Sequence, residues 1–191
     1  QLFKKYDRFN ILDFKILKNE CKKNKIDFMC TAFDINGVKE INKLVDIFKI
    51  SSSDLTNYPL IREISKFKKP IILSTGASNL SEINEAVKLI KKYHSKIILL
   101  HCVLNYPTKN RNAYLGLINI LKSKFKNIPI GYSDHTFKNF NLNILTAWIN
   151  GAVLIEKHFT HNKKLPGNDH YHSADFKDLI KLNEDFSQII T

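Results

Sequence analysis

The most constraining feature of this sequence is an alternation between short β-branched runs and segments whose apolar residues recur at helical spacing. A polar cluster follows each run, which is the usual signal of βα units that build a parallel sheet. Six runs are predicted to be strands, at residues 26–31, 45–51, 70–74, 96–102, 128–132 and 152–156. Apolar spacing predicts helices within residues 38–45, 60–67, 83–90, 117–121 and 176–186.

Periodicity alone allows two architectures for these units, an open doubly wound sheet or part of a (β/α)₈ barrel. The polar side chains at the ends of the predicted strands favour the barrel, because in a barrel all strand ends converge on one site, whereas an open sheet concentrates such residues at one switch point. They are Thr31, Lys49 with Ser52, Ser74, His101 with Tyr106, Ser133 with His135, and Glu156 with His158. We therefore predict an α/β fold of the (β/α)₈ TIM-barrel class, incomplete here, with about six βα units.

Length and charge limit the classes of protein to consider. The chain of 191 residues is long enough for one domain. Its net charge is +12, but 27 of the 30 basic residues are Lys and only 3 are Arg. Proteins that read bases and phosphates favour the Arg fork, so specific nucleic-acid binding is not expected. A basic field also attracts small phosphorylated substrates.

The cysteines and the apolar stretches indicate the environment of the chain. Cys21, Cys30 and Cys102 form no CxxC pair and are odd in number, which argues against a disulfide framework and a zinc knuckle. A reducing, cytoplasmic location is expected. The longest apolar stretches fall short of 18 residues, so no membrane span or membrane partner is predicted.

Lys49 stands inside an apolar run, where a charge is costly without a partner. An ammonium at a strand end suits a phosphate or a carboxylate; the alternative is that it points to solvent at a sheet edge. The hydroxyls of 51–53 and the Ser74-Thr75-Gly76 turn also suit phosphate, although ordinary turn capping explains such residues equally well.

His135 and His158 each follow one of two consecutive predicted strands, which brings them to the same rim of a parallel sheet. Two imidazoles completed by oxygen ligands can bind a divalent ion, and this donor set suits Mn²⁺ better than structural zinc. A single histidine would more often be a hydrogen-bonded core residue. Asp134 and Glu156 beside the pair support the metal interpretation.

The loop after the last strand carries further polar residues. His161, His170 and His172 fit no ligand spacing, and we interpret them as lining or covering the site. Asp169 follows residues 166–168 in the same loop; its carboxylate could hold sugar hydroxyls or cap the turn. His94 and His101 are interpreted as structural.

Six strings of the sequence together resemble the N-acetylneuraminate (sialic acid) synthase family, which includes legionaminic and pseudaminic acid synthases. They occur in the family's order: FKISSSDLTNYPLI (48–61), KPIILSTGAS (69–78), LLHCVLNYPT (99–108), IPIGYSDHT (128–136), IEKHFT (155–160) and PGNDH (166–170). The resemblance implies a barrel that condenses phosphoenolpyruvate with an N-acyl amino-sugar aldehyde, such as N-acetylmannosamine, to give a nine-carbon 2-keto sugar acid and phosphate. It also implies Mn²⁺, with Mg²⁺ or Co²⁺ as alternatives, and a homodimer for the full-length enzyme.

The resemblance also assigns roles to individual residues. It places His135 and His158 on the metal, with Glu156 near the reacting aldehyde. The sugar-binding positions are Tyr106, Glu156 and Asp169. The phosphoenolpyruvate-binding positions are Thr31, Lys49, Ser52, Ser74 and Ser133.

Residues 1–191 are expected to form a single catalytic barrel domain that lacks the family's first two strands and its C-terminal antifreeze-like domain. Three alternatives stay open at this stage. They are another phosphoenolpyruvate-condensing barrel that uses a phosphorylated sugar, a basic interaction module, and an inactive fragment.

Overall fold

The structure is a computed structural model that describes residues 9–137 and 139–190. Two compact units divide the chain: residues 9–72 with 80–97, and residues 73–79 with 98–190. The strands are hydrogen-bonded in chain order, β1-β2-β3-β4-β5. None of the helices in the described residues combines the length and the apolar character that a membrane crossing requires.

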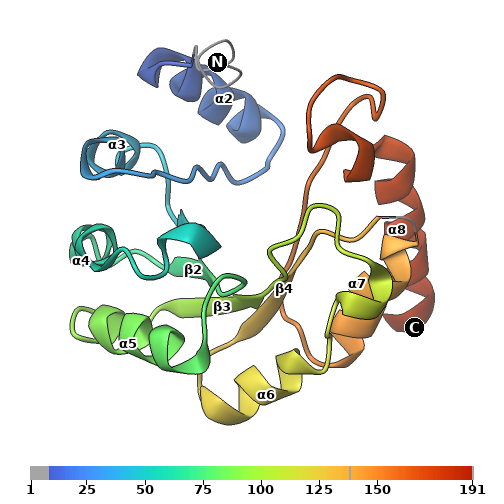
Figure 1. Ribbon diagram of the computed structural model, residues 1–191. Coiled ribbons are helices and arrows are strands. Elements are labelled where there is room, and N and C mark those ends of the chain that lie inside the picture. The colour runs from blue at the N-terminus through green and yellow to red at the C-terminus, as the bar shows by residue number, and fades with distance from the viewer. Residues whose placement is uncertain (1–8, 138, 191) are drawn as a thin grey trace. The chain divides into compact units, whose positions relative to one another are not determined.

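The first unit alternates helices with the first two strands. Its elements are α2 (Ile11–Lys23), α3 (Ile35–Ile41), β1 (Phe48–Ile50), the 3₁₀ helix η1 (Ser52–Asp54), α4 (Tyr58–Lys66), the start of β2 (Ile71–Ser74) and α5 (Leu80–Lys91). The α4 helix begins where the Asn57 side chain accepts from the Leu60 amide, and it buries Leu60, Ile61 and Ile64. The α3, α4 and α5 helices lie side by side (Figure 1), each with a buried apolar stripe.

The second unit contains most of β3 (Ile97–His101), together with β4 (Ile130–Asp134) and β5 (Ile155–Lys157), all parallel. Leu100 pairs with Gly131. A Cβ at Gly131 would come within 2.5 Å of the Leu100 side chain and 2.6 Å of the Leu154 carbonyl oxygen. Glycine at this position therefore lets β3, β4 and the entry to β5 approach closely enough to pair.

Helices cover this part of the sheet. The remaining elements are η2 (Asn110–Asn112), α6 (Leu117–Lys124), α7 (Phe140–Ile149), η3 (His170–His172) and α8 (Phe176–Ile190). Both α6 and α7 pack against β4 (Figure 1). An apolar core joins α7 to α8, and it consists of Phe140, Ile144 and Ala174 with the partly buried Ile155, Leu182 and Phe186. This packing fixes the backbone at the ends of β4 and β5.

The predicted α/β class is confirmed, and helices lie in all five predicted segments. The prediction of six strands is wrong by one within the described residues. Residues 26–31 form no strand; of this run, only Thr31 pairs, in an isolated parallel bridge with Lys49. The physical reason is visible in the exposure of Ile26 (62%) and Met29 (42%), whose apolar side chains are not packed into a core.

Candidate metal and substrate site

The ends of β4 and β5 present two sets of side chains on opposite faces of the strand pair. Ser133 pairs in register with Glu156, and Asp134 pairs with Lys157. Because side chains alternate along a strand, Ser133 and Glu156 share one face while Asp134 and Lys157 share the other. We name these the front face (Ser133, His135, Glu156 and His158) and the back face (Tyr132, Asp134, Thr136 and Lys157).

His135 and His158 lie together at the ends of their strands, as the sequence predicts. Their ring centroids are 5.3 Å apart and the rings are nearly perpendicular. The Nδ1 atom of His135 lies 3.1 Å from the Val103 carbonyl oxygen, which can only accept, so Nδ1 carries the proton and Nε2 keeps the lone pair. Burial is the main reason that the pKa of His135 falls to about 4. A neutral imidazole with a fixed tautomer is the form that binds a metal.

Tyr106 also lies at this cluster of imidazoles. Its ring centroid is 4.2 Å from that of His135 and 5.8 Å from that of His158. Burial is the main cause that raises the pKa of its phenol. The structure therefore brings one predicted sugar-binding residue to the two predicted metal ligands.

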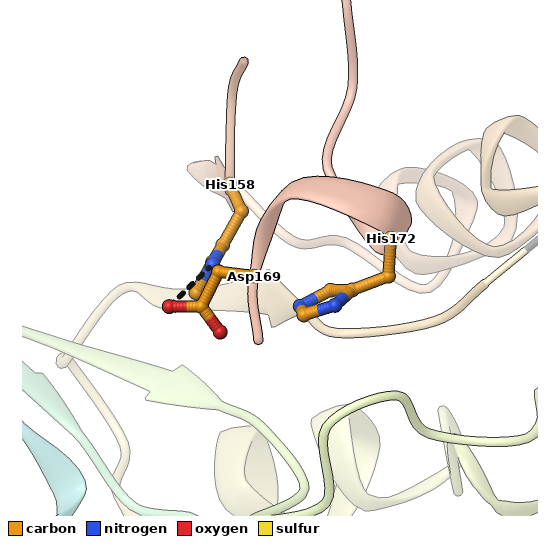
Figure 2. A group of neighbouring side chains, drawn as sticks. All are labelled: His158, Asp169 and His172. Atoms are coloured by element: carbon orange, nitrogen blue, oxygen red, sulfur yellow. Dashed lines mark ion pairs between the residues drawn. The ribbon is translucent and has the colours of Figure 1, made fainter. Parts of the chain in front are cut away.

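Figure 2 shows a second grouping around His158, formed by Asp169 and His172. One ligand atom from each of the three residues lies within 4.8 Å of the other two. The Asp169 carboxylate is 3.8 Å from Nδ1 of His158, and the ring centroids of His158 and His172 are 5.2 Å apart. The sequence spacing of His172 predicts no ligand role. The structure places His172 and Asp169 beside the predicted metal ligand His158.

Ser133 and Glu156 interact directly. The Ser133 hydroxyl donates to Oε1 of Glu156 at 2.5 Å, and Ser133 is buried whereas Glu156 is half-buried. A hydroxyl has one proton, so Ser133 cannot donate to a phosphate while it donates to Glu156. Its oxygen lone pairs stay available to a donor. The carboxylate of Glu156 is thereby held at the end of β5, two residues before His158.

Ser74 of β2 is a buried hydroxyl within the second unit. Its Oγ has no hydrogen-bond partner among the described residues. Burying a polar group without a partner is unfavourable, so this hydroxyl is suited to a ligand.

Three predicted phosphoenolpyruvate residues belong to the first unit. Thr31 bridges to Lys49 in parallel fashion, and Ser52 opens η1 directly after β1. Lys49 is half-buried, and its Nζ donates to the Ile50 carbonyl at 3.2 Å. The alternative interpretation predicts an ammonium that points into solvent, and the observed Lys49 side chain is only partly exposed.

The back face carries a buried ionic network that the sequence analysis did not identify. Nζ of Lys157 donates to Oδ2 of Asp134 at 2.7 Å, and the side chains are 7% and 0% exposed. The hydroxyls of Tyr132 and Thr136 donate to Oδ1 of Asp134 at 2.7 and 2.8 Å. Lys157 also donates to the Thr136 carbonyl at 2.9 Å and lies over the Phe140 ring. This network ties β4 to β5 one residue before each of the two histidines.

The donor set of the front face fits a divalent cation. Two neighbouring imidazoles, together with the nearby Asp169 carboxylate, match the mixed nitrogen and oxygen coordination of the intermediate first-row metals. The cluster offers no thiolate among these residues, which argues against a closed structural zinc site.

Parallel strands with covering helices, and paired histidines at adjacent strand ends, define the class as a barrel-type α/β protein. The profile of the NeuB family matches residues 1–191. The chain belongs to the NeuB family.

Several of its relatives are named as synthases, and one similar relative is an uncharacterized protein. It is 46% identical to uncharacterized protein MJ1065 of Methanocaldococcus jannaschii, over 88% of this chain and 50% of that protein. It is 41% identical to the N,N'-diacetyllegionaminic acid synthase of Campylobacter jejuni, over 93% of this chain and 54% of that protein. The chain thus spans about half the length of the curated relatives it matches.

Solved structures agree with the fold. The crystal structure of N-acetylneuraminic acid synthetase from Leptospira borgpetersenii, in complex with citrate, superposes with a TM-score of 0.88 at 39% identity, over 95% of this chain and 63% of that one. A truncated 3-deoxy-D-arabino-heptulosonate 7-phosphate synthase from Thermotoga maritima superposes with a TM-score of 0.83 at 17% identity, over 95% of this chain and 72% of that one. The latter similarity concerns the fold alone.

Proposed function

We propose that this protein carries the catalytic site of a sialic-acid-type synthase. The reaction joins phosphoenolpyruvate, an N-acyl amino-sugar aldehyde and water to give a nine-carbon 2-keto sugar acid and inorganic phosphate. The observation that carries the proposal is the His135–His158 pair at adjacent strand ends in a chain of the NeuB family, since the family's named relatives include several such synthases.

The proposed chemistry balances as follows. C3 of the enol attacks the aldehyde carbon, a C–C bond forms, and the aldehyde oxygen takes up a proton to become a hydroxyl. The cationic C2 that results is captured by water, which loses a proton. The bond between C2 and the phosphate ester oxygen then breaks, the leaving phosphate takes up the proton of the new C2 hydroxyl, and C2 becomes the ketone. No oxidant or reductant is consumed.

His135 and His158 are the residues proposed to hold the divalent cation, for which Mn²⁺ is the first candidate. When bound, such a cation supplies Lewis-acid polarisation of the aldehyde oxygen. The protein's own part is to keep the His135 imidazole neutral and to orient both rings. The Val103 carbonyl fixes the ring of His135 for that purpose.

The amino sugar is assigned to Tyr106, Glu156 and Asp169. Tyr106 lies against the imidazoles, and Glu156 is held by Ser133 at the end of β5. A carboxylate at that position can hold sugar hydroxyls and can exchange a proton with the aldehyde oxygen as it becomes a hydroxyl. Asp169 lies 3.8 Å from His158, within reach of the same substrate.

Phosphoenolpyruvate is assigned on the family resemblance. Lys49 would supply positive charge, and Thr31, Ser52 and Ser74 would supply hydroxyl donors. Ser133 is assigned on the same resemblance, and its hydroxyl can donate to phosphate only when it does not donate to Glu156. The orphaned Oγ of Ser74 supports its part in this assignment.

The test is phosphate release from phosphoenolpyruvate by the protein encoded by the complete gene, in the presence of Mn²⁺. The acceptors to compare are N-acetylmannosamine, the di-acetamido hexoses that lead to legionaminic and pseudaminic acids, and a phosphorylated aldose. We expect release with an N-acyl amino sugar, and a nine-carbon 2-keto acid by mass spectrometry. Release with the phosphorylated aldose alone would replace this proposal by that of a heptulosonate-type or octulosonate-type synthase, and release with none of the acceptors would refute it.

A further inference from the structure

His172 is the most unusual polar residue of the second unit. It is 1% exposed, and both of its ring nitrogens are buried without a hydrogen-bond partner of normal geometry among the described residues. The backbone of Asn168 makes a marginal hydrogen-bonding contact with the ring, and this contact is the smallest of the influences on the pKa of His172. A buried imidazole with two unused nitrogens is unfavourable unless something else binds to it.

Neighbouring polar groups of the same loop do have partners, so the loop is not simply poorly satisfied. Nδ1 of His170 lies 2.8 Å from the Thr160 hydroxyl. The Ser173 hydroxyl donates to the Asp169 carbonyl at 2.6 Å. Unlike these groups, the ring nitrogens of His172 have no partner of normal geometry among the described residues, so they are available to a ligand.

The backbone holds His172 in place beside His158. After β5 the chain leaves as a loop and returns, and the return is paired to the outgoing chain by a parallel bridge between Phe159 and Ala174. The Ala174 amide donates to the His158 carbonyl at 2.8 Å, and the Thr160 amide donates to the Ala174 carbonyl at 2.8 Å. His172 comes two residues before this anchor, and its ring lies 5.2 Å from the ring of His158.

We propose that His172 is a third imidazole ligand of the divalent cation bound by His158, with the Asp169 carboxylate completing the same side of the site. The inference rests on the cation assigned under the proposed function, and it adds a ligand that the sequence resemblance does not supply. Figure 2 shows the ring of His172 directed toward Asp169 and His158.

The distances are compatible with a shared ion. Ligand atoms about 2.1 Å from a metal lie at most about 4.2 Å from one another. The three ligand atoms of His158, Asp169 and His172 lie within 4.8 Å of one another before any ion is considered. The Asp169 side chain is 61% exposed, so its carboxylate has room to adjust toward a shared ion.

A third imidazole has a chemical consequence that distinguishes this site from a pair of histidines. Imidazole nitrogen favours cobalt, nickel and zinc more than it favours manganese and magnesium. A site with His172 should therefore bind Co²⁺ more tightly, relative to Mn²⁺, than the same site without it. The ratio of the two affinities reports the ligand itself, whereas general loosening of the loop would weaken both metals alike.

The experiment titrates the metal-free full chain with Mn²⁺ alone and with Co²⁺ alone, by calorimetry and by electron paramagnetic resonance of bound Mn²⁺. His172→Phe fills the same buried space without a ligand atom, and His172→Ala is the second variant. Lys164→Ala is the matched control, because Lys164 is an exposed residue of the same loop and has no assigned role at the site. Circular dichroism confirms that each variant is folded.

We expect both His172 variants to bind Co²⁺ at least about 10-fold more weakly, with a smaller loss for Mn²⁺ and one fewer nitrogen coupling in pulsed spectra of Mn²⁺. Lys164→Ala should match the wild type. Unchanged affinities and couplings in folded His172 variants, alongside lost binding in His135→Ala or His158→Ala, would overturn the role of His172 and leave the proposed function intact. Unchanged affinities in all four histidine variants would reject the cation of the proposed function as well.

Discussion

The two faces of the β4–β5 pair differ in how their polar groups are satisfied. On the back face, each oxygen of the Asp134 carboxylate has a protein donor, and Lys157 has two protein acceptors. On the front face, His135 uses one ring nitrogen and leaves the other with a lone pair. The same two strands thus carry a network closed on itself and a set of groups still able to bind.

The difference separates the residues that stabilise the site from the residues that can bind a ligand in it. A buried hydrogen-bonded network in which every group has a partner resists displacement of its members. In this network Asp134 directly precedes His135, and Lys157 directly precedes His158. The open set depends on that rigidity, because ligand atoms need positions fixed to a fraction of an ångström. We therefore expect substitutions on the back face to change stability and substitutions on the front face to change binding and turnover.

The largest expected effect is on the back face. Asp134→Ala removes the partner of a Lys157 ammonium that is only 7% exposed, and also strands the Tyr132 and Thr136 hydroxyls. Breaking a buried pair in this way costs about 3–5 kcal/mol. Urea unfolding of the metal-free protein should show this loss in the free energy of unfolding. A loss under about 1 kcal/mol would mean that the network does not hold the strands.

The double variant Asp134→Leu with Lys157→Met provides the control. Replacing both members of a buried pair by apolar residues is often nearly neutral. Recovery of most of the stability in the double variant would assign the loss to the unpaired charge. Failure to recover would assign it to packing against Phe140.

The sequence predicts the front face better than the back face. His135 and His158 follow consecutive strands, and adjacent parallel strands end at the same rim, so their proximity is fixed by topology. Lys157 has no such signal. Its partnership with Asp134 depends on the register Asp134↔Lys157, which a shift of one residue would abolish.

Other features of the structure that the sequence does not predict also have local causes. The α7 helix (FNLNILTAWI) is apolar on most of its surface, so helical spacing does not distinguish it from a strand. His172 reaches His158 only because the loop returns and pairs at Ala174, and no pattern in the sequence specifies that return. Residues 26–31 have strand composition, but composition does not supply a neighbouring strand along their length.

The next effect is on the front face. His135→Ala removes a proposed cation ligand, and losing a ligand should cost more than the roughly 10–100-fold typical of residues that only support one. We expect cation-dependent turnover to fall more than about 100-fold. The free energy of unfolding of the metal-free protein should change far less than in Asp134→Ala. Full turnover in metal-stripped buffer, by wild type or variant, would contradict the role of His135.

A smaller effect is expected for Glu156→Gln, which keeps the shape of the side chain and removes its charge. The Ser133 hydroxyl can still donate to the amide oxygen. Loss of a charged hydrogen-bond partner should lower kcat/KM for the amino sugar by about 10–100-fold. Asp134→Asn is the matched exchange on the back face, and it should lower stability more than Glu156→Gln does. Equal effects on stability would erase the distinction between the faces.

The smallest effect concerns His101, whose ring stacks on Tyr132 of the back face at 5.7 Å and donates from Nε2 to the Ala113 carbonyl. Burial lowers its pKa below 6.5. Below pH 6.5 the unfolded chain therefore takes up a proton that the folded chain refuses, and the free energy of unfolding falls as the pH falls toward the folded pKa. This histidine can contribute at most about 1.4 kcal/mol per pH unit. His101→Gln should reduce the slope in metal-free urea titrations between pH 6.5 and 5. An unaltered slope in His101→Gln would mean that the folded protein accommodates a charged imidazole at residue 101, beside Tyr132 of the back face.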